Sequence, residues 1–97
     1  MTYCFGIDGT LFTETNGEYE RSHPIQIRID MVNKLHEQGN KIILSCSRGE
    51  CNRSLTERQL EESGVQYDEL FMDKVRADFY VDDRGFNVYE WFYQHDN

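Results

Sequence analysis

Short apolar runs alternate with amphipathic stretches along the first half of the chain. Residues Tyr3 to Ile7 form an apolar run that is too short for a helix and rich in β-forming side chains, so we expect a strand. Apolar residues then recur at helical spacing between Pro24 and Gly39, which predicts a helix that ends at the glycine. The continuous apolar run from Lys41 to Ser45 is typical of a strand buried on both faces of a parallel sheet.

The second half of the chain repeats this alternation. Ser54 and Glu57 have the spacing of a capping box, which predicts a helix from near Leu55 to Gly64. Further runs predict two strands and a terminal helix or aromatic cover, at residues 65–72, 78–81 and 87–94. Strands that alternate with helices imply βαβ units. We therefore expect a small doubly wound, Rossmann-like parallel α/β sheet.

A polar segment interrupts the pattern between the first expected strand and the first expected helix. It contains Asn16-Gly17 between Thr, Glu and Tyr residues, which is a strong signal for a tight hairpin turn. We expect a β-hairpin flap over residues 12–21.

Composition narrows the class of protein. Ninety-seven residues suit one domain, so we expect a single domain over residues 1–97 with one site. No apolar run approaches the roughly 20 residues of a membrane span and no signal peptide begins the chain, which favours a cytoplasmic protein without a membrane partner. A net charge of −8 opposes nucleic-acid binding. Three cysteines without regular spacing are expected to be reduced thiols.

Charged and hydroxyl side chains follow each expected strand. In a doubly wound sheet, ligands bind beyond the carboxyl ends of the strands, so these residues are expected to converge there. They are Asp8, Gly9 and Thr10, then Cys46, Ser47 and Arg48, then Asp73 and Lys74, and finally Asp82 and Asp83. Three carboxylates suit Mg²⁺, and a lysine beside them would complement phosphate charge.

These segments resemble a known family. "GIDGTLF", "KIILSCSRG", "DK" and "ADFYVDDRG" follow the order of the four motifs of haloacid dehalogenase-like (HAD) phosphatases, over Tyr3 to Gly85. The resemblance is strongest to small capless members associated with capsule or sugar-phosphate metabolism. In that superfamily the first Asp of the first motif attacks phosphorus, and the Asp two positions later acts as acid and base.

The resemblance implies roles for individual residues. Asp8 would be the acid/base, and Lys74 would clamp the phosphoryl group. The other implied phosphate-binding positions are Gly9, Thr10, Cys46, Ser47 and Arg48, and the implied ligands of Mg²⁺ are Asp8, Asp82 and Asp83. The expected ligand is a small phosphorylated molecule.

One position departs from the family in a way that bears directly on activity. The nucleophile position is occupied by Gly6, which has no side chain. Asp8 lies two strand residues further on, roughly 6.6 Å away, which is too far for it to attack in place of residue 6. Loss of a nucleophile costs on the order of 10⁶ in rate, so hydrolysis is expected to be impaired while ligand binding is retained.

Three hypotheses remain open from the sequence. The first is a HAD-like domain with an impaired site that still binds Mg²⁺ and a phosphorylated ligand. The second is an active Mg²⁺-dependent phosphatase with an unusual nucleophile, and the third is a non-catalytic interaction module. The presence of Asp8, Lys74, Asp82 and Asp83 at the expected strand ends argues against the third hypothesis.

Overall fold

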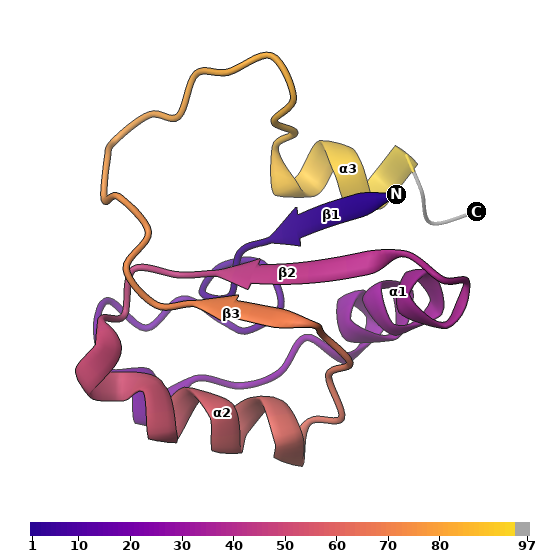
Figure 1. Ribbon diagram of the computed structural model, residues 1–97. Coiled ribbons are helices and arrows are strands. Elements are labelled where there is room, and N and C mark those ends of the chain that lie inside the picture. The colour runs from indigo at the N-terminus through magenta and orange to yellow at the C-terminus, as the bar shows by residue number, and fades with distance from the viewer. Residues whose placement is uncertain (95–97) are drawn as a thin grey trace.

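A parallel β-sheet forms the centre of the protein. The computed structural model describes residues 1–94, and within them the sheet has three strands in the order β1 (Thr2–Phe5), β2 (Lys41–Ser45) and β3 (Glu69–Phe71). The helices are α1 (Gln26–Glu37), α2 (Arg53–Glu62) and α3 (Val88–Gln94). Two short 3₁₀ turns, η1 (Tyr19–Arg21) and η2 (Glu50–Asn52), lie in the connections (Figure 1). The predicted α/β class with a parallel sheet is confirmed.

The sheet has one well-buried face. The register pairs Phe5 with Leu44 and Cys4 with Ile43, so neighbouring side chains alternate between the two faces. Phe5, Ile42 and Leu44 are buried in the core, whereas Ile43 is half-buried and Cys4 is exposed. The prediction that Lys41 to Ser45 is buried on both faces is therefore wrong, because helical packing covers the Ile42 side more fully.

The helices are joined to one another as well as to the sheet. Asn33 of α1 donates a hydrogen bond to the Gly64 carbonyl after α2 and accepts one from the Gln66 amide. Trp91 of α3 packs edge-on against the rings of Tyr3 and Phe5 at 6.1 and 5.2 Å between centroids. The prediction that the aromatic residues of the last helix cover the core is confirmed for Trp91 and Phe92, whereas Tyr93 is exposed.

Glycine ends both of the longer helices, as predicted. Gly39 and Gly64 adopt φ of 94° and 71° just after α1 and α2, a conformation that other residues rarely adopt. The predicted capping box is wrong, however. Helix α2 begins at Arg53, and its cap Asn52 makes no side-chain capping hydrogen bond. Ser54 thus lies inside the first turn, because η2 leads directly into the helix and moves its start.

The predicted fourth strand is absent from the described residues. Asp78 to Val81 lie in an extended segment, and residues 73–87 are all exposed and contain no helix or strand (Figure 1). Phe79 and Val81 are 85% and 95% exposed, so their apolar character does not reflect burial here. The predicted third strand also shortens from residues 65–72 to Glu69–Phe71.

The predicted hairpin flap forms only in part. Asn16 and Gly17 have φ of 54° and 95°, which is the tight turn that the pair favours. No strands flank the turn; instead, the amide of Thr13 donates to the His23 carbonyl at 2.8 Å, and an isolated bridge joins Phe12 to Pro24. The flap is therefore a loop that is closed at its base and includes η1.

Among the described residues, none of the helices combines the length and the apolar character needed to cross a bilayer.

Candidate functional site

A pocket of about 580 Å³ lies at the carboxyl ends of β1 and β2. Three separate segments contribute its walls, together with the flap: the loop after β1, the loop after β2 and the segment after β3. The lining residues that the sequence singled out are Gly6, Asp8, Thr10, Cys46, Ser47 and Lys74, and Tyr19 of the flap lines the pocket as well. The structure thus brings together residues up to 68 positions apart in the chain, as expected for strand ends of a parallel sheet.

A compact turn positions Asp8 at the floor of this pocket. The Ile7 carbonyl accepts hydrogen bonds from the amides of Thr10, Leu11 and Phe12, at 2.9 to 3.1 Å. Gly9 has φ of 78°, a conformation that a side chain would strain. Gly9 and Thr10 therefore shape the turn through their backbone, and Thr10 also lines the pocket.

Arg28 of α1 holds this turn from behind. Its guanidinium donates to the carbonyls of Thr10 at 3.0 Å and Gly9 at 3.4 Å. The same group lies over the rings of Tyr89 and Phe92 of α3, at 5.3 and 5.2 Å from their centroids. Arg28 consequently links the site loop to the last helix.

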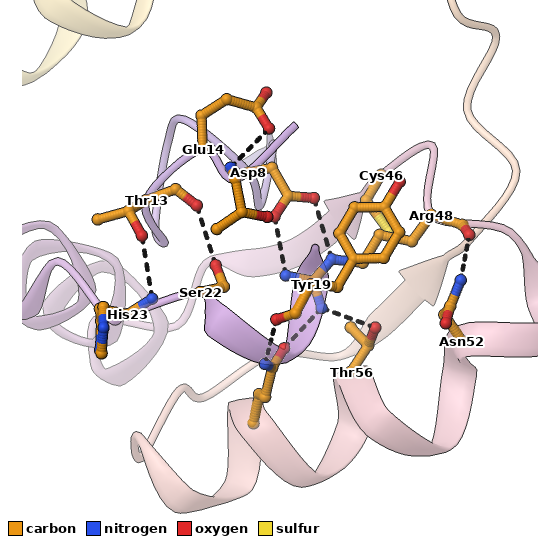
Figure 2. Close-up of polar contacts among 12 residues, drawn as sticks. Asp8, Thr13, Glu14, Tyr19, Ser22, His23, Cys46, Arg48, Asn52 and Thr56 are labelled. Carbon is orange, nitrogen blue, oxygen red and sulfur yellow. Dashed lines mark hydrogen bonds and ion pairs between the residues drawn. The ribbon is translucent and has the colours of Figure 1, made fainter. Parts of the chain in front are cut away.

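Asp8 is paired with Arg48. Arg48 Nη2 lies 2.8 Å from Asp8 Oδ1, and Nε lies 3.0 Å from Oδ2, so the two groups form a bidentate ion pair (Figure 2). The side chain of Arg48 is 0% exposed and that of Asp8 is 15% exposed. Both carboxylate oxygens are therefore engaged in a largely desolvated contact.

Other partners fix Arg48 in place. Its Nη1 donates to Thr56 Oγ1 at 3.0 Å and to Gln59 Oε1 at 2.6 Å, both on α2. The guanidinium also lies 4.8 Å from the centre of the Tyr19 ring (Figure 2). Gln59 in turn donates to the Tyr19 carbonyl at 2.7 Å. Arg48 thus connects Asp8, helix α2 and the flap.

Ser47 and Lys74 are tied together through the backbone. Ser47 Oγ donates to the Lys74 carbonyl at 2.9 Å, and the Lys74 amide donates to the Cys46 carbonyl at 2.9 Å. The Lys74 ammonium lies 4.5 Å from the centre of the Tyr80 ring. Because the Ser47 hydroxyl already donates its proton within the protein, it can face a ligand only as an acceptor.

Arg76 adds a second cation to the pocket wall. Its Nη2 lies 3.3 Å from the Ser47 carbonyl and 3.4 Å from the Tyr19 hydroxyl. Arg76 and Lys74 both line the pocket, and both belong to the exposed segment after β3. These long contacts hold Arg76 weakly, so it can turn toward an anion.

Gly6 lies in the wall of the pocket that Asp8 and Lys74 also line. A Cβ at residue 6 would meet Thr10 Oγ1 at 3.0 Å, which requires a small shift of that hydroxyl. The φ angle of Gly6 lies outside the left-handed region. A side chain is therefore sterically acceptable at this position.

The two other predicted metal ligands do not form a cluster with Asp8. Asp82 lines a neighbouring pocket beside β1 and accepts hydrogen bonds from the amides of Arg84 and Gly85. The Asp83 side chain is 88% exposed and lies 3.9 Å from Arg84. Within residues 1–94, no three His, Cys, Asp or Glu side chains gather where they could hold a metal ion. As arranged, these residues do not fit Mg²⁺.

Two cysteines near the site carry protonated thiols. Burial raises the pKa of Cys46, and partial desolvation raises the pKa of the more exposed Cys4 despite the opposing effect of Lys74. The Cys46 thiol contacts Met72 Sδ at 3.8 Å. A thiol with a raised pKa is a poor nucleophile at neutral pH. Neither cysteine therefore substitutes readily for the side chain missing at Gly6.

Sequence reasoning missed several residues that shape the site. Arg28, Thr56, Gln59 and Arg76 were not singled out, although each contacts a residue that was. One signal was available for two of them. Thr56 and Gln59 are three positions apart, and Thr56 lies four positions before the buried Leu60, which places polar side chains on or beside the inner face of a helix.

Comparisons with known proteins show the fold. No family model matches the chain, and no curated protein matches it. The chain is similar to a structural-genomics target from Vibrio cholerae, with a TM-score of 0.76 and 22% sequence identity over 93% of this chain and 85% of that one.

It is also similar to a chain of the Pnkp1/Rnl/Hen1 complex, with a TM-score of 0.66 and 22% identity over 98% of this chain and 33% of that one. A chain of the Pnkp1/Rnl/Hen1 RNA repair complex is similar as well, with a TM-score of 0.62 and 23% identity over 97% of this chain and 31% of that one. This chain spans about a third of the length of these two chains. At such identities, the likeness establishes a shared fold with all three.

Proposed function

We propose that the protein is a capless HAD-like domain that binds a small phosphorylated ligand and is impaired in hydrolysing it. The observation that carries this proposal is the position of Gly6 in the wall of a pocket that also holds Asp8, Ser47 and Lys74. In the resembling family, these positions supply a nucleophile, an acid/base, a hydroxyl loop and a phosphate clamp. The chain has side chains at the last three positions, with Asp8 paired to Arg48, and lacks one at the first.

The charge of the pocket supports anion binding. Lys74 and Arg76 face the cavity as cations, whereas Asp8 is neutralised by Arg48. A carboxylate at residue 6 would add a negative charge beside the phosphoryl group. The absence of a carboxylate at residue 6 therefore removes the nucleophile and also the repulsion between that carboxylate and the phosphoryl group.

Mg²⁺ stays a prediction of the resemblance. Asp8 is committed to Arg48, and Asp82 and Asp83 form no cluster with it within the described residues, so no step is assigned to the metal. The overall charge of −8 does not favour a nucleic-acid ligand, although two of the structural neighbours come from RNA repair assemblies.

Calorimetric titration tests the binding part of the proposal. Inorganic phosphate and phenyl phosphate are titrated into the native protein and into Lys74→Gln, in buffer with Mg²⁺ and in buffer with a chelator. Loss of one charged hydrogen bond of about 1.5–3 kcal/mol should weaken binding roughly 10- to 100-fold. Lys34→Gln is the matched control, because Lys34 is an exposed lysine on α1 outside the pocket. Absence of binding in both buffers would favour a non-catalytic interaction module.

Hydrolysis of p-nitrophenyl phosphate in the presence of Mg²⁺ tests the impairment. We expect no turnover by the native chain or by the neutral control Gly6→Asn, because neither has a carboxylate at residue 6. Gly6→Asp restores a carboxylate there but leaves Asp8 paired with Arg48, so its turnover should be slow at most. Native turnover that disappears in Lys74→Gln would instead establish an active phosphatase with an unusual nucleophile. That outcome would overturn the impaired-site interpretation.

A further inference from the structure

We infer that the pocket binds the phosphoryl group of a small phosphomonoester through protein cations alone, with Arg48 taking the place of a divalent metal beside Asp8. This inference rests on the proposed function and narrows it. It departs from the Mg²⁺ dependence that the resemblance implies. The evidence is the set of protein groups that each carboxylate and each cation of the pocket contacts.

The first step concerns the carboxylate at the floor of the pocket. A metal ion would need an oxygen of Asp8, but Oδ1 and Oδ2 each accept a hydrogen bond from Arg48, at 2.8 and 3.0 Å. The cation of Arg48 thus already balances the charge of this carboxylate. A second positive ion at the same oxygens would be repelled by the guanidinium.

The second step concerns the rigidity of Arg48. Its side chain is 0% exposed, and its remaining donor Nη1 is engaged by Thr56 and Gln59 on α2. The Tyr19 ring lies against the guanidinium at 4.8 Å. To release Asp8 for a metal, Arg48 would have to leave a buried position where four groups hold it. This arrangement favours a permanent ion pair over an exchangeable one.

The third step concerns the other carboxylate of the pocket. Glu14 belongs to the flap, and its Oε2 accepts hydrogen bonds from the amides of Thr15 and Asn16 at 2.9 and 3.1 Å. One oxygen of Glu14 is therefore occupied by the backbone of the flap turn. The three cations Lys74, Arg76 and Arg48 stand against the two carboxylates of Asp8 and Glu14, so the site has a surplus of one positive charge without any metal.

The chemical class of the ligand follows from charge and size. Two cations on one wall suit a dianionic phosphate, and a volume of about 580 Å³ leaves room for a small organic group beyond it. The Lys74 ammonium lies 4.5 Å from the centre of the Tyr80 ring, and Tyr19 of the flap also lines the pocket, so two aromatic rings are available to contact the organic group. A small phosphomonoester is therefore a better fit than inorganic phosphate alone.

The test compares the affinity for phenyl phosphate in excess chelator and in excess Mg²⁺ by isothermal titration calorimetry. We expect the two dissociation constants to agree within about twofold. Binding that appears only with Mg²⁺, or tightens by roughly tenfold or more, would overturn metal independence and leave the proposed function intact. Absence of binding in both buffers would overturn the proposed function itself.

A variant of Arg76 tests the cation assignment without disturbing the core. Arg76→Gln should weaken metal-free binding of phenyl phosphate by about tenfold, and Arg76→Lys should recover part of the affinity, because the charge is retained. Arg58→Gln is the control, since Arg58 is an exposed arginine on α2 outside the pocket. Equal affinity of Arg76→Gln and Arg58→Gln would refute the role of Arg76. Its long contacts at the surface make a folding defect an implausible explanation for a loss.

Discussion

The Arg48–Asp8 ion pair permits a quantitative prediction about stability. Arg48→Met should destabilise the protein by about 3–5 kcal/mol, because the substitution leaves the carboxylate of Asp8 without its cation in a largely desolvated position. Asp8 is only 15% exposed, so water can compensate little of the loss. The hydrogen bonds support the same magnitude, since bonds to charged groups contribute about 1.5–3 kcal/mol each and the pair has two.

Urea unfolding followed by the fluorescence of Trp91 provides the assay, because Trp91 is the single tryptophan of the chain and is buried in the core. Met keeps an unbranched apolar stem at residue 48, so the loss of charge dominates the change. Arg58→Met is the matched control and should shift the free energy of unfolding by no more than about 0.5 kcal/mol. A loss below about 1 kcal/mol for Arg48→Met would refute the reasoning.

A double-mutant cycle separates the pair from its surroundings. Asp8→Leu combined with Arg48→Met removes both charges, and the double variant should lose clearly less stability than the sum of the two single variants. If Arg48→Met does not fold, Thr56→Val provides a milder perturbation. Thr56 is completely buried and accepts one hydrogen bond from Arg48, so this nearly isosteric change should cost about 1 kcal/mol. Strictly additive single variants would show that the two charges act independently.

Three further predictions follow from single residues. Gly6→Asp should bind phenyl phosphate in metal-free buffer roughly tenfold more weakly than Gly6→Asn, as measured by calorimetry, because only the former adds a like charge. The hydrogen bond from the Ile42 amide, and to a lesser degree His36, lowers the pKa of Asp68. The ionised Asp68 carboxylate therefore contributes stability above the ordinary carboxyl range, and this contribution is lost as the pH falls through the folded pKa. Asp68→Asn should consequently weaken the pH dependence of the urea midpoint between pH 7 and about pH 3. Cys46, buried and with a raised pKa, should react with a disulfide reagent at neutral pH only on unfolding, and rapid native labelling would contradict this.

Local patterns predicted the elements on which the site is built. The strand at Lys41 to Ser45 was predicted with the bounds observed, because a run of apolar residues between polar flanks leaves little ambiguity. Gly39 and Gly64 marked helix ends, because their positive φ is needed there. The convergence of Asp8 and Lys74 followed from the parallel order of the strands.

Long-range partners could not be read from a single sequence. Arg48 and Asp8 are 40 residues apart, and nothing local distinguishes an arginine that pairs with a carboxylate from one that awaits a phosphate. The expected strand at residues 78–81 failed for a related reason. Its apolar residues satisfy the strand pattern, but a strand also requires a partner, and within the described residues β1 pairs with β2 alone.

The exposed segment at residues 73–87 has a consequence for proteolysis. It contains three trypsin sites, Lys74, Arg76 and Arg84, in backbone without helix or strand. Such backbone is readily cleaved when a protease can bind it in extended form. Two of these sites would contact the proposed ligand, whereas Arg84 lies outside the pocket. Ligand should therefore slow cleavage after residues 74 and 76 more than after residue 84, so a peptide map can report occupancy residue by residue.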